Sequence, residues 1–192
     1  MDALTILLVV VALLLAGGYF WYVSLIRRRN GAREALSSID VQLRKRHDLL
    51  PNVLKLAGRF MAHEKALLEE IVRLRSEAMQ GYRPEVPEEV KAHLEAEAAL
   101  QAAAGRLMVA VEQYPELRSV ETMTEAQQTF TEVEGHIAAA RRFYNAAVTD
   151  LNNAVEIFPG SLIANIAGVR RMPFFEIEEA ARAPVNVDDY LN

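Results

Sequence analysis

The chain contains no cysteine among its 192 residues. A disulfide framework, a thiolate nucleophile and a cysteine-based zinc site are therefore excluded. A glycine-rich phosphate-binding loop is also missing, and no serine, histidine and acidic residue stand together in a recognisable catalytic context. No motif indicates a catalytic activity, and we expect a protein that is not an enzyme and has no cofactor or bound metal.

Positive charge is scarce beyond residue 50. Residues 27–50 carry seven Lys and Arg against three Asp and Glu, whereas residues 51–192 carry fourteen against twenty-two. Phosphate backbones are bound by basic surfaces, so the acidic remainder argues against nucleic acid as a partner. The basic part instead adjoins an apolar segment, where anionic lipid headgroups would attract it.

The apolar segment, Ala3 to Ile26, has no charged residue over 24 positions. As a helix it would be about 36 Å long, which is enough to cross the hydrocarbon core of a bilayer. A cleaved signal peptide, the alternative, needs a basic region before a shorter apolar run, and only Asp2 precedes this one. We therefore predict a retained transmembrane anchor, with the lipid bilayer as a partner.

Aromatic and basic residues mark the end of this segment. Residues 19–22 are all aromatic, which is typical of the belt at a membrane interface. Arg27, Arg28 and Arg29 follow soon after. The positive-inside rule then predicts an N-terminus outside the cell and a cytoplasmic body.

Three later stretches repeat apolar residues every three or four positions, which is the period of an amphipathic helix. They cover residues 28–80, 87–114 and 122–158, and proline and glycine separate them. Thr122 and Glu125 fit a capping box at the start of the third stretch. Long helices joined by short loops imply an antiparallel bundle.

The predicted fold is therefore all-α, with an N-terminal transmembrane helix followed by an antiparallel bundle whose first long helix is kinked near Pro51. The expected domains are the anchor over residues 1–27, a cytoplasmic bundle over residues 28–175, and a C-terminal tail over residues 176–192. The tail lacks helical periodicity and is expected to be loose.

Two local features lie in the first long helix. Proline removes a backbone donor, so we expect a kink or short break at Pro51, with Asn52 able to bond a freed backbone group. The kink is either a static packing feature or a hinge. Asp40, Arg44 and Asp48 lie four residues apart, so they share a face on which opposite charges can pair.

The sequence IDVQLRKRHDLLPNV, residues 39–53, resembles the signature of the LemA family, with Leu50 where isoleucine is usual. The resemblance covers nearly the whole chain and continues through Ala62–Lys65, Glu112–Leu117, Ala140–Asn145 and Phe174–Phe175. It implies a bacterial, membrane-anchored helical protein of the inner membrane with no agreed biochemical activity. The positions that match the family motifs are Asp40, Arg44, His47, Asp48, Pro51, Asn52, His63, Glu64, Tyr114, Pro115, Arg141, Tyr144 and Asn145.

A metal-dependent or acid–base enzyme is one alternative, centred on Asp40, His47, His63 and Glu64. Those side chains would have to meet in one pocket. The sequence after His63 and Glu64 lacks the second histidine of a zinc-protease helix. The structural interpretation is that these residues form ion pairs and hydrogen bonds that set the register of the bundle.

Arg141 and Arg142, beside Tyr144 and Asn145, offer planar donors that suit an anion or a phosphorylated partner. Tyr144 also lies on the apolar stripe of its helix. That position favours a core tyrosine, with the arginines paired to acids of a neighbouring helix.

The leading hypothesis is a non-enzymatic scaffold that self-assembles into a membrane-bound homo-oligomer. Its candidate contact surface lies between Ser161 and Phe175, a stretch more apolar than a free tail needs. The same stretch could cover the open end of its own bundle. The apolar residues concerned are Ile163, Ile166, Val169, Phe174 and Phe175.

The family resemblance adds membrane organisation or envelope quality control as roles. LemA-like proteins are often encoded beside a membrane zinc metalloprotease, which makes such a protease a candidate partner, and one relative takes part in magnetosome membrane biogenesis. A further alternative is an anionic-lipid-binding, membrane-shaping protein that uses the clusters Arg27–Arg33 and Arg44–Arg46.

Overall fold

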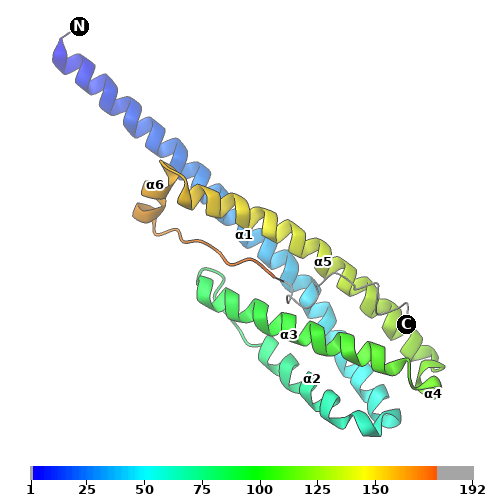
Figure 1. Cartoon of the computed structure of the whole chain (residues 1–192). Coiled ribbons are helices and arrows are strands. Elements are labelled where there is room, and N and C mark those ends of the chain that lie inside the picture. The colour runs from blue at the N-terminus through cyan, green and yellow to red at the C-terminus, as the bar shows by residue number, and fades with distance from the viewer. Residues whose placement is uncertain (1, 177–192) are drawn as a thin grey trace, which may run out of the picture.

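The computed structural model describes residues 2–176, and every regular element in that range is a helix (Figure 1). This confirms the predicted all-α class with a long apolar helix at the N-terminus. In chain order the elements are α1 (Ala3–Phe60), the 3-10 helix η1 (Ala62–Glu64), α2 (Lys65–Ala78), α3 (Pro87–Val111), α4 (Pro115–Arg118), α5 (Glu121–Glu156) and α6 (Gly160–Ala167).

Helix α1 carries both the apolar segment and the first helix of the bundle as one element of 58 residues. Its mean hydropathy reaches 2.5 over an 18-residue window, and none of that window is buried inside the protein. The first buried residue is Leu25. Among the described residues, α1 is the one helix that is long and apolar enough to cross a membrane.

The body of the protein is a bundle in which successive long helices run in opposite directions (Figure 1). Helix α5 packs along α1, and α2 packs along α3. Helices α1 and α3 therefore run in the same direction. Residue numbers therefore rise in the same direction along α1 and α3 where the two helices face each other.

The prediction of a single helix over residues 28–80 is wrong. The chain leaves α1 at Phe60, passes through η1 and returns as α2. Ile71 and Leu74 of α2 are buried in the same cluster as Leu107 of α3. A straight continuation of α1 would carry these apolar side chains away from the bundle, so the reversal is favoured by their burial.

Helix α1 continues through Pro51 without the short break that the proline suggests. Proline has no N–H, so the carbonyl of His47, four residues earlier, loses its helical partner. Nε of Arg75 on α2 donates a hydrogen bond to that carbonyl at 2.9 Å. Asn52 is exposed, so the freed acceptor is satisfied by a neighbouring helix rather than by the residue predicted to do so.

The start of α5 also differs from the prediction. The helix begins at Glu121, and its N-cap residue, Val120, makes no side-chain hydrogen bond. Thr122 therefore lies inside the helix and is not the cap. Thr124 Oγ1 instead donates to the carbonyl of Arg118 at 3.1 Å, because the short helix α4 ends beside it.

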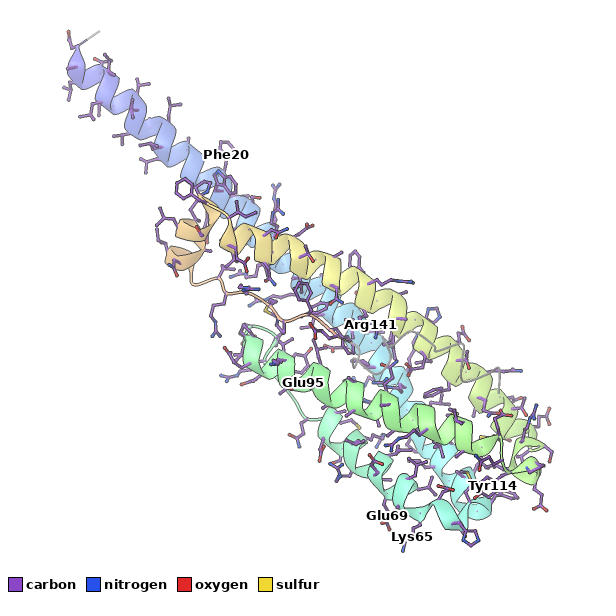
Figure 2. The ribbon with its side chains drawn as sticks, viewed as in Figure 1. Phe20, Lys65, Glu69, Glu95, Tyr114 and Arg141 are labelled. Carbon is purple, nitrogen blue, oxygen red and sulfur yellow. The ribbon has the colours of Figure 1, made fainter. Side chains whose placement is uncertain are left out.

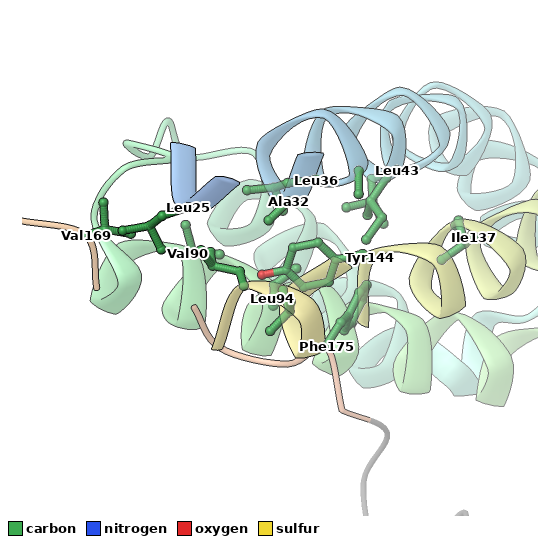
Figure 3. Packing of buried hydrophobic residues seen from close by; sticks show 14 of the residues in the cluster. Leu25, Ala32, Leu36, Leu43, Val90, Leu94, Ile137, Tyr144, Val169 and Phe175 are labelled. Carbon is green, nitrogen blue, oxygen red and sulfur yellow. The ribbon is translucent and has the colours of Figure 1, made fainter. Parts of the chain in front are cut away.

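Buried apolar side chains form two clusters along the bundle. The cluster nearer the anchor joins α1, α3, α5, α6 and the residues after α6 (Figure 3). The second cluster lies at the end of the bundle away from the anchor and contains residues of α1, α2, α3, α4 and α5. Prominent members of the first are Leu25, Leu36, Val90, Tyr144 and Phe175, and of the second Leu50, Val53, Leu100, Leu107 and Phe130.

After α6 the chain runs back along α5 as an extended segment, residues 169–176, which we call the strap (Figure 1). Val169 and Phe175 of the strap are buried in the cluster near the anchor. The predicted tail, residues 176–192, lies outside the described residues apart from Glu176.

Candidate functional site

A charged layer lies between the two apolar clusters. Arg46 on α1 stands between Leu43 of one cluster and Leu50 of the other, and its side chain is 0% exposed. Glu97 is equally buried on α3. We define the charged layer as four side chains from three helices: Arg46, His47, Glu97 and Glu134.

The layer is held together by hydrogen-bonded ion pairs. Arg46 Nη2 donates to Glu97 Oε2 at 2.5 Å and to the Glu97 backbone carbonyl at 3.1 Å. Arg46 Nη1 donates to Glu134 Oε1 on α5 at 3.1 Å. His47 Nε2 lies 3.0 Å from Glu97 Oε1. One guanidinium thus joins three helices, which its planar set of donors suits well.

The environment of Glu97 keeps its carboxylate ionised. Burial alone would raise its pKa, because it removes the charge from water. The hydrogen bond from His47 and the positive charge of Arg46 outweigh burial, so the pKa of Glu97 lies below its ordinary value of 4.5. A carboxylate locked in its charged form acts as a structural partner for Arg46 rather than as a proton donor.

A second polar site, formed by Asp40, Tyr82 and His93, lies closer to the anchor than the charged layer does. Tyr82 donates its hydroxyl to Asp40 Oδ2 at 2.7 Å, and His93 Nε2 lies 3.4 Å from Asp40 Oδ1. The Tyr82 and His93 rings stack with centroids 4.2 Å apart. The pKa of Tyr82 is raised, mainly by burial and next by the hydrogen bond to Asp40. The phenol therefore stays protonated and remains a donor.

This arrangement corrects the predicted pairing along α1. Asp40 is engaged by Tyr82 and by His93 of α3 rather than by Arg44. Arg44 and Asp48 are exposed, and neither makes an ion pair with any residue in the range 2–176.

The four residues of the predicted enzyme site do not meet. His47 contacts Glu97, and Asp40 contacts a different histidine. His63 is exposed on η1, beyond the end of α1 and roughly 30 Å along the helix axis from Asp40. Within the part of the chain that the structure describes, no group of three or more His, Asp or Glu side chains could hold a metal ion. The convergence with Glu64 that the enzyme alternative requires therefore does not occur.

A third polar site is on α5, where two asparagines hold the strap. Asn145 Nδ2 donates to the carbonyl of Phe175 at 3.1 Å, and its Oδ1 accepts from the Phe175 N–H at 2.9 Å. Asn152 does the same with Met172, at 3.0 Å and 2.9 Å. Each amide thus satisfies both polar groups of one strap residue, as a neighbouring β-strand would.

The neighbours of Asn145 complete this clamp. Tyr144 is fully buried and donates its hydroxyl to the carbonyl of Pro173 at 2.8 Å. The guanidinium of Arg141 (labelled in Figure 2) lies 5.8 Å from the ring centroid of Phe175, a cation–π contact. Burial lowers the pKa of Arg141. Arg141, Tyr144 and Asn145 therefore contact the protein's own C-terminal segment.

The predicted contact surface around α6 divides into two sets. Val169 and Phe175 are buried in the core, and Ile163 is packed against it. Ile166 and Phe174 are exposed. The segment therefore covers its own bundle, and it also leaves apolar side chains uncovered.

Tyr114 and Pro115 lie at the end of the bundle farthest from the anchor (Tyr114 is labelled in Figure 2). Pro115 is the first residue of α4, where its missing N–H costs nothing. Tyr114 packs against the far cluster, and Leu117 of α4 is buried in it. Helix α3 ends at Val111 rather than at the predicted residue 114, and Tyr114 and Pro115 start α4.

Sequence reasoning missed residues that complete these three polar sites. A signal exists for two of them, because Arg46 and Glu97 each stand three or four positions from apolar residues on both sides, which is a core position. The others reveal themselves only through contacts between helices. The missed residues are Arg46, Tyr82, His93, Glu97, Glu134 and Asn152.

The fold and these sites define a helical-bundle protein with an N-terminal apolar helix that extends out of the bundle. Its buried polar groups join one helix to another and hold the strap. The sequence matches the LemA family over residues 35–188, and the chain belongs to that family.

The chain is similar to magnetosome proteins of two bacteria. It is 28% identical to MamQ 2 and to MamQ 1 of Paramagnetospirillum magneticum over 169 residues, which cover 78% of this chain and 62% of each relative. It is 26% identical to MamQ of Magnetospirillum gryphiswaldense over 174 residues, or 80% of this chain and 64% of the relative. The chain thus matches less than two thirds of the length of these relatives.

Proposed function

We propose that this protein is a non-enzymatic scaffold anchored in the bacterial inner membrane, with a cytoplasmic bundle that binds partners and self-assembles. One observation carries the proposal: α1 is uninterrupted from its exposed apolar window to Arg46 in the charged layer. A continuous helix couples the bundle to the bilayer as one body. The bundle then presents its surface, rather than a reactive pocket, to other molecules.

Two further observations support assembly in a membrane. Gly17 and Gly18 lie in the apolar part of α1, and a Cβ added to either would have no group from the rest of the protein within 4 Å. Small residues allow transmembrane helices to approach closely. The relatives are named as magnetosome proteins, which agrees with a role in organising membranes.

Self-assembly is tested on the full chain in nanodiscs by size-exclusion chromatography with light scattering, combined with crosslinking in native membranes. We expect a mass of more than one copy, and a smaller mass for the variant Gly17→Leu/Gly18→Leu. A matched control, Leu14→Val, changes an exposed apolar residue of the same helix without adding bulk. A protein that stays monomeric in lipid contradicts the oligomer, and crosslinked partners, including a membrane metalloprotease, would identify the other contacts.

The absence of cysteine allows a direct test of orientation. Single variants Asp2→Cys and Val109→Cys place a thiol at either end of the molecule, both at exposed positions. In intact cells with a permeabilised outer membrane, an impermeant maleimide should label Asp2→Cys alone. Labelling of Val109→Cys instead would reverse the proposed orientation.

Binding of anionic lipid is a second candidate, favoured by the exposed side chains of Arg27 and Arg28 at the end of the apolar segment. The cluster Arg44–Arg46 does not contribute as predicted. Arg46 is buried in the charged layer, and Arg44 lies roughly 25 Å along α1 from Arg27. Salt-sensitive flotation of residues 27–192 with anionic vesicles would support this candidate, and no binding would remove it.

A further inference from the structure

The chain turns a corner between α5 and the strap, over residues 157–169, and this corner is uncharged. No Asp, Glu, Lys or Arg occurs from Ile157 to Val169, although Glu156 and Arg170 flank this stretch directly. The run contains all of α6 and the turn before it. Outside the apolar part of α1, a stretch of this composition at the protein surface requires an explanation.

Helix α6 has two apolar faces. One face packs on the bundle: Ala164 is buried, and Ile163 and Ala167 lie against the cluster near the anchor. The other face is bare, with Leu162 59% exposed and Ile166 82% exposed. Phe158, four residues before Leu162, is 78% exposed. Leu162 and Ile166 are four residues apart on α6 and therefore share one side of the helix, away from the core. Phe158 lies in the turn before α6 and adds a third exposed apolar side chain to the corner.

The corner lies beside the end of the apolar segment of α1. A Cβ placed on Gly160 would lie 3.6 Å from the Trp21 ring, and Ala164 shares a cluster with Leu25. Figure 2 shows α6 close to Phe20, at the opposite end of the bundle from Tyr114.

The depth of the corner follows from α1. Trp21 precedes the first arginine, Arg27, by six residues, which is about 9 Å along a helix. Interfacial helices bury their apolar face about 5–10 Å into the boundary between headgroups and acyl chains. The start of α6 therefore lies at the level where such a helix would rest.

We propose that the exposed face of the corner, formed by Phe158, Leu162 and Ile166, inserts into the interface of the leaflet that faces the bundle. The occupant of this surface is lipid, because the surface continues directly from the apolar segment of α1. The bundle then has two membrane contacts rather than one, which fixes its tilt against the bilayer.

The charges around the corner agree with this placement. Arg171 pairs with Glu156 at 2.6 Å, so the acid nearest the corner is neutralised. Arg27 and Arg28 are exposed beside the same end of the bundle and suit lipid headgroups. The inference rests on the proposed membrane anchor but does not depend on self-assembly.

The test uses full-length single-cysteine variants labelled with an environment-sensitive fluorophore in vesicles of phosphatidylethanolamine and phosphatidylglycerol. Ile166→Cys and Phe158→Cys report on the corner. Val109→Cys, on an exposed apolar residue of α3, is the matched control, and Leu8→Cys reports on the anchor. Quenching is measured with aqueous iodide and with lipids that carry a nitroxide near the headgroup.

We expect the two corner labels to be quenched by the shallow nitroxide and to be several-fold less sensitive to iodide than the label at position 109. Iodide quenching equal to that of the control would overturn the inference. Protection from both quenchers that rises with protein density would overturn it in favour of a second copy. If the label at position 8 is also reached by iodide, the anchor itself fails, which separates that outcome from failure of the corner alone.

Discussion

Nε of Arg75 on α2 donates to the backbone carbonyl of His47 on α1 at 2.9 Å. Pro51 leaves this carbonyl without its helical partner, because proline has no N–H to offer four residues later. The proline therefore creates an acceptor on the side of α1, and Arg75 uses it to attach a helix that otherwise packs mainly on α3.

This relationship predicts that Arg75 and Pro51 are energetically coupled. Arg75→Ala should lower the free energy of unfolding by about 1.5–3 kcal/mol, the usual range for a hydrogen bond from a charged group. In a Pro51→Ala background the helix bonds its own carbonyl, so the same change should cost markedly less. A double-mutant cycle by urea denaturation in detergent measures the coupling. Equal costs in both backgrounds would show that Arg75 acts elsewhere.

The charged layer predicts a large cost for removing one partner. Arg46→Met should destabilise the protein by about 3–5 kcal/mol, because it leaves Glu97 buried without its main counter-charge. Arg46→Met combined with Glu97→Leu should recover much of the loss. The control is Arg73→Met, which breaks an exposed pair with Glu77 and should cost about 1 kcal/mol or less. Thermal melts in detergent compare the four proteins, and a double variant no more stable than Arg46→Met contradicts this account.

The predicted elements match the observed ones where the signal is local, and they differ where the cause lies elsewhere in the chain. The bounds of α3 and α5 follow closely from the apolar period and from punctuation such as Pro87 and Pro159, because both signals lie within a few residues of the helix end. The reversal after Phe60 has no proline or glycine in η1 to mark it. Its cause is burial of α2 against a helix that comes later in the chain.

The candidate site shows the same limit. Local spacing identifies Asp40 and His47 as chemistry-bearing residues on α1, but their partners, His93 and Glu97, lie on α3. Which side chains meet depends on how two parallel helices are offset along the bundle. That offset is set by packing of the whole core rather than by any short stretch of sequence.

Loss of the Glu97 charge at low pH should weaken the bundle. Its pKa is depressed in the folded protein, so its contribution is complete above the ordinary value of 4.5 and is lost as pH falls through the lower folded value. Stability should therefore fall with acidification below pH 4.5. Glu97→Gln should be less stable at neutral pH but lose less on acidification. Melting temperatures of both proteins across this range measure the difference, and parallel curves would show that other carboxylates account for the acid response.

The two asparagines on α5 predict that the strap can be released without unfolding the bundle. Asn152→Ala leaves the N–H and carbonyl of Met172 without partners, a loss of about 1–3 kcal/mol. Hydrogen exchange should therefore accelerate at residues 169–176 while the core of α5 stays protected. Asn153→Ala, at the exposed neighbouring position, should leave exchange unchanged. Because the strap joins the cluster near the anchor through Phe175, exchange that rises equally throughout α5 would instead make the clamp part of global stability.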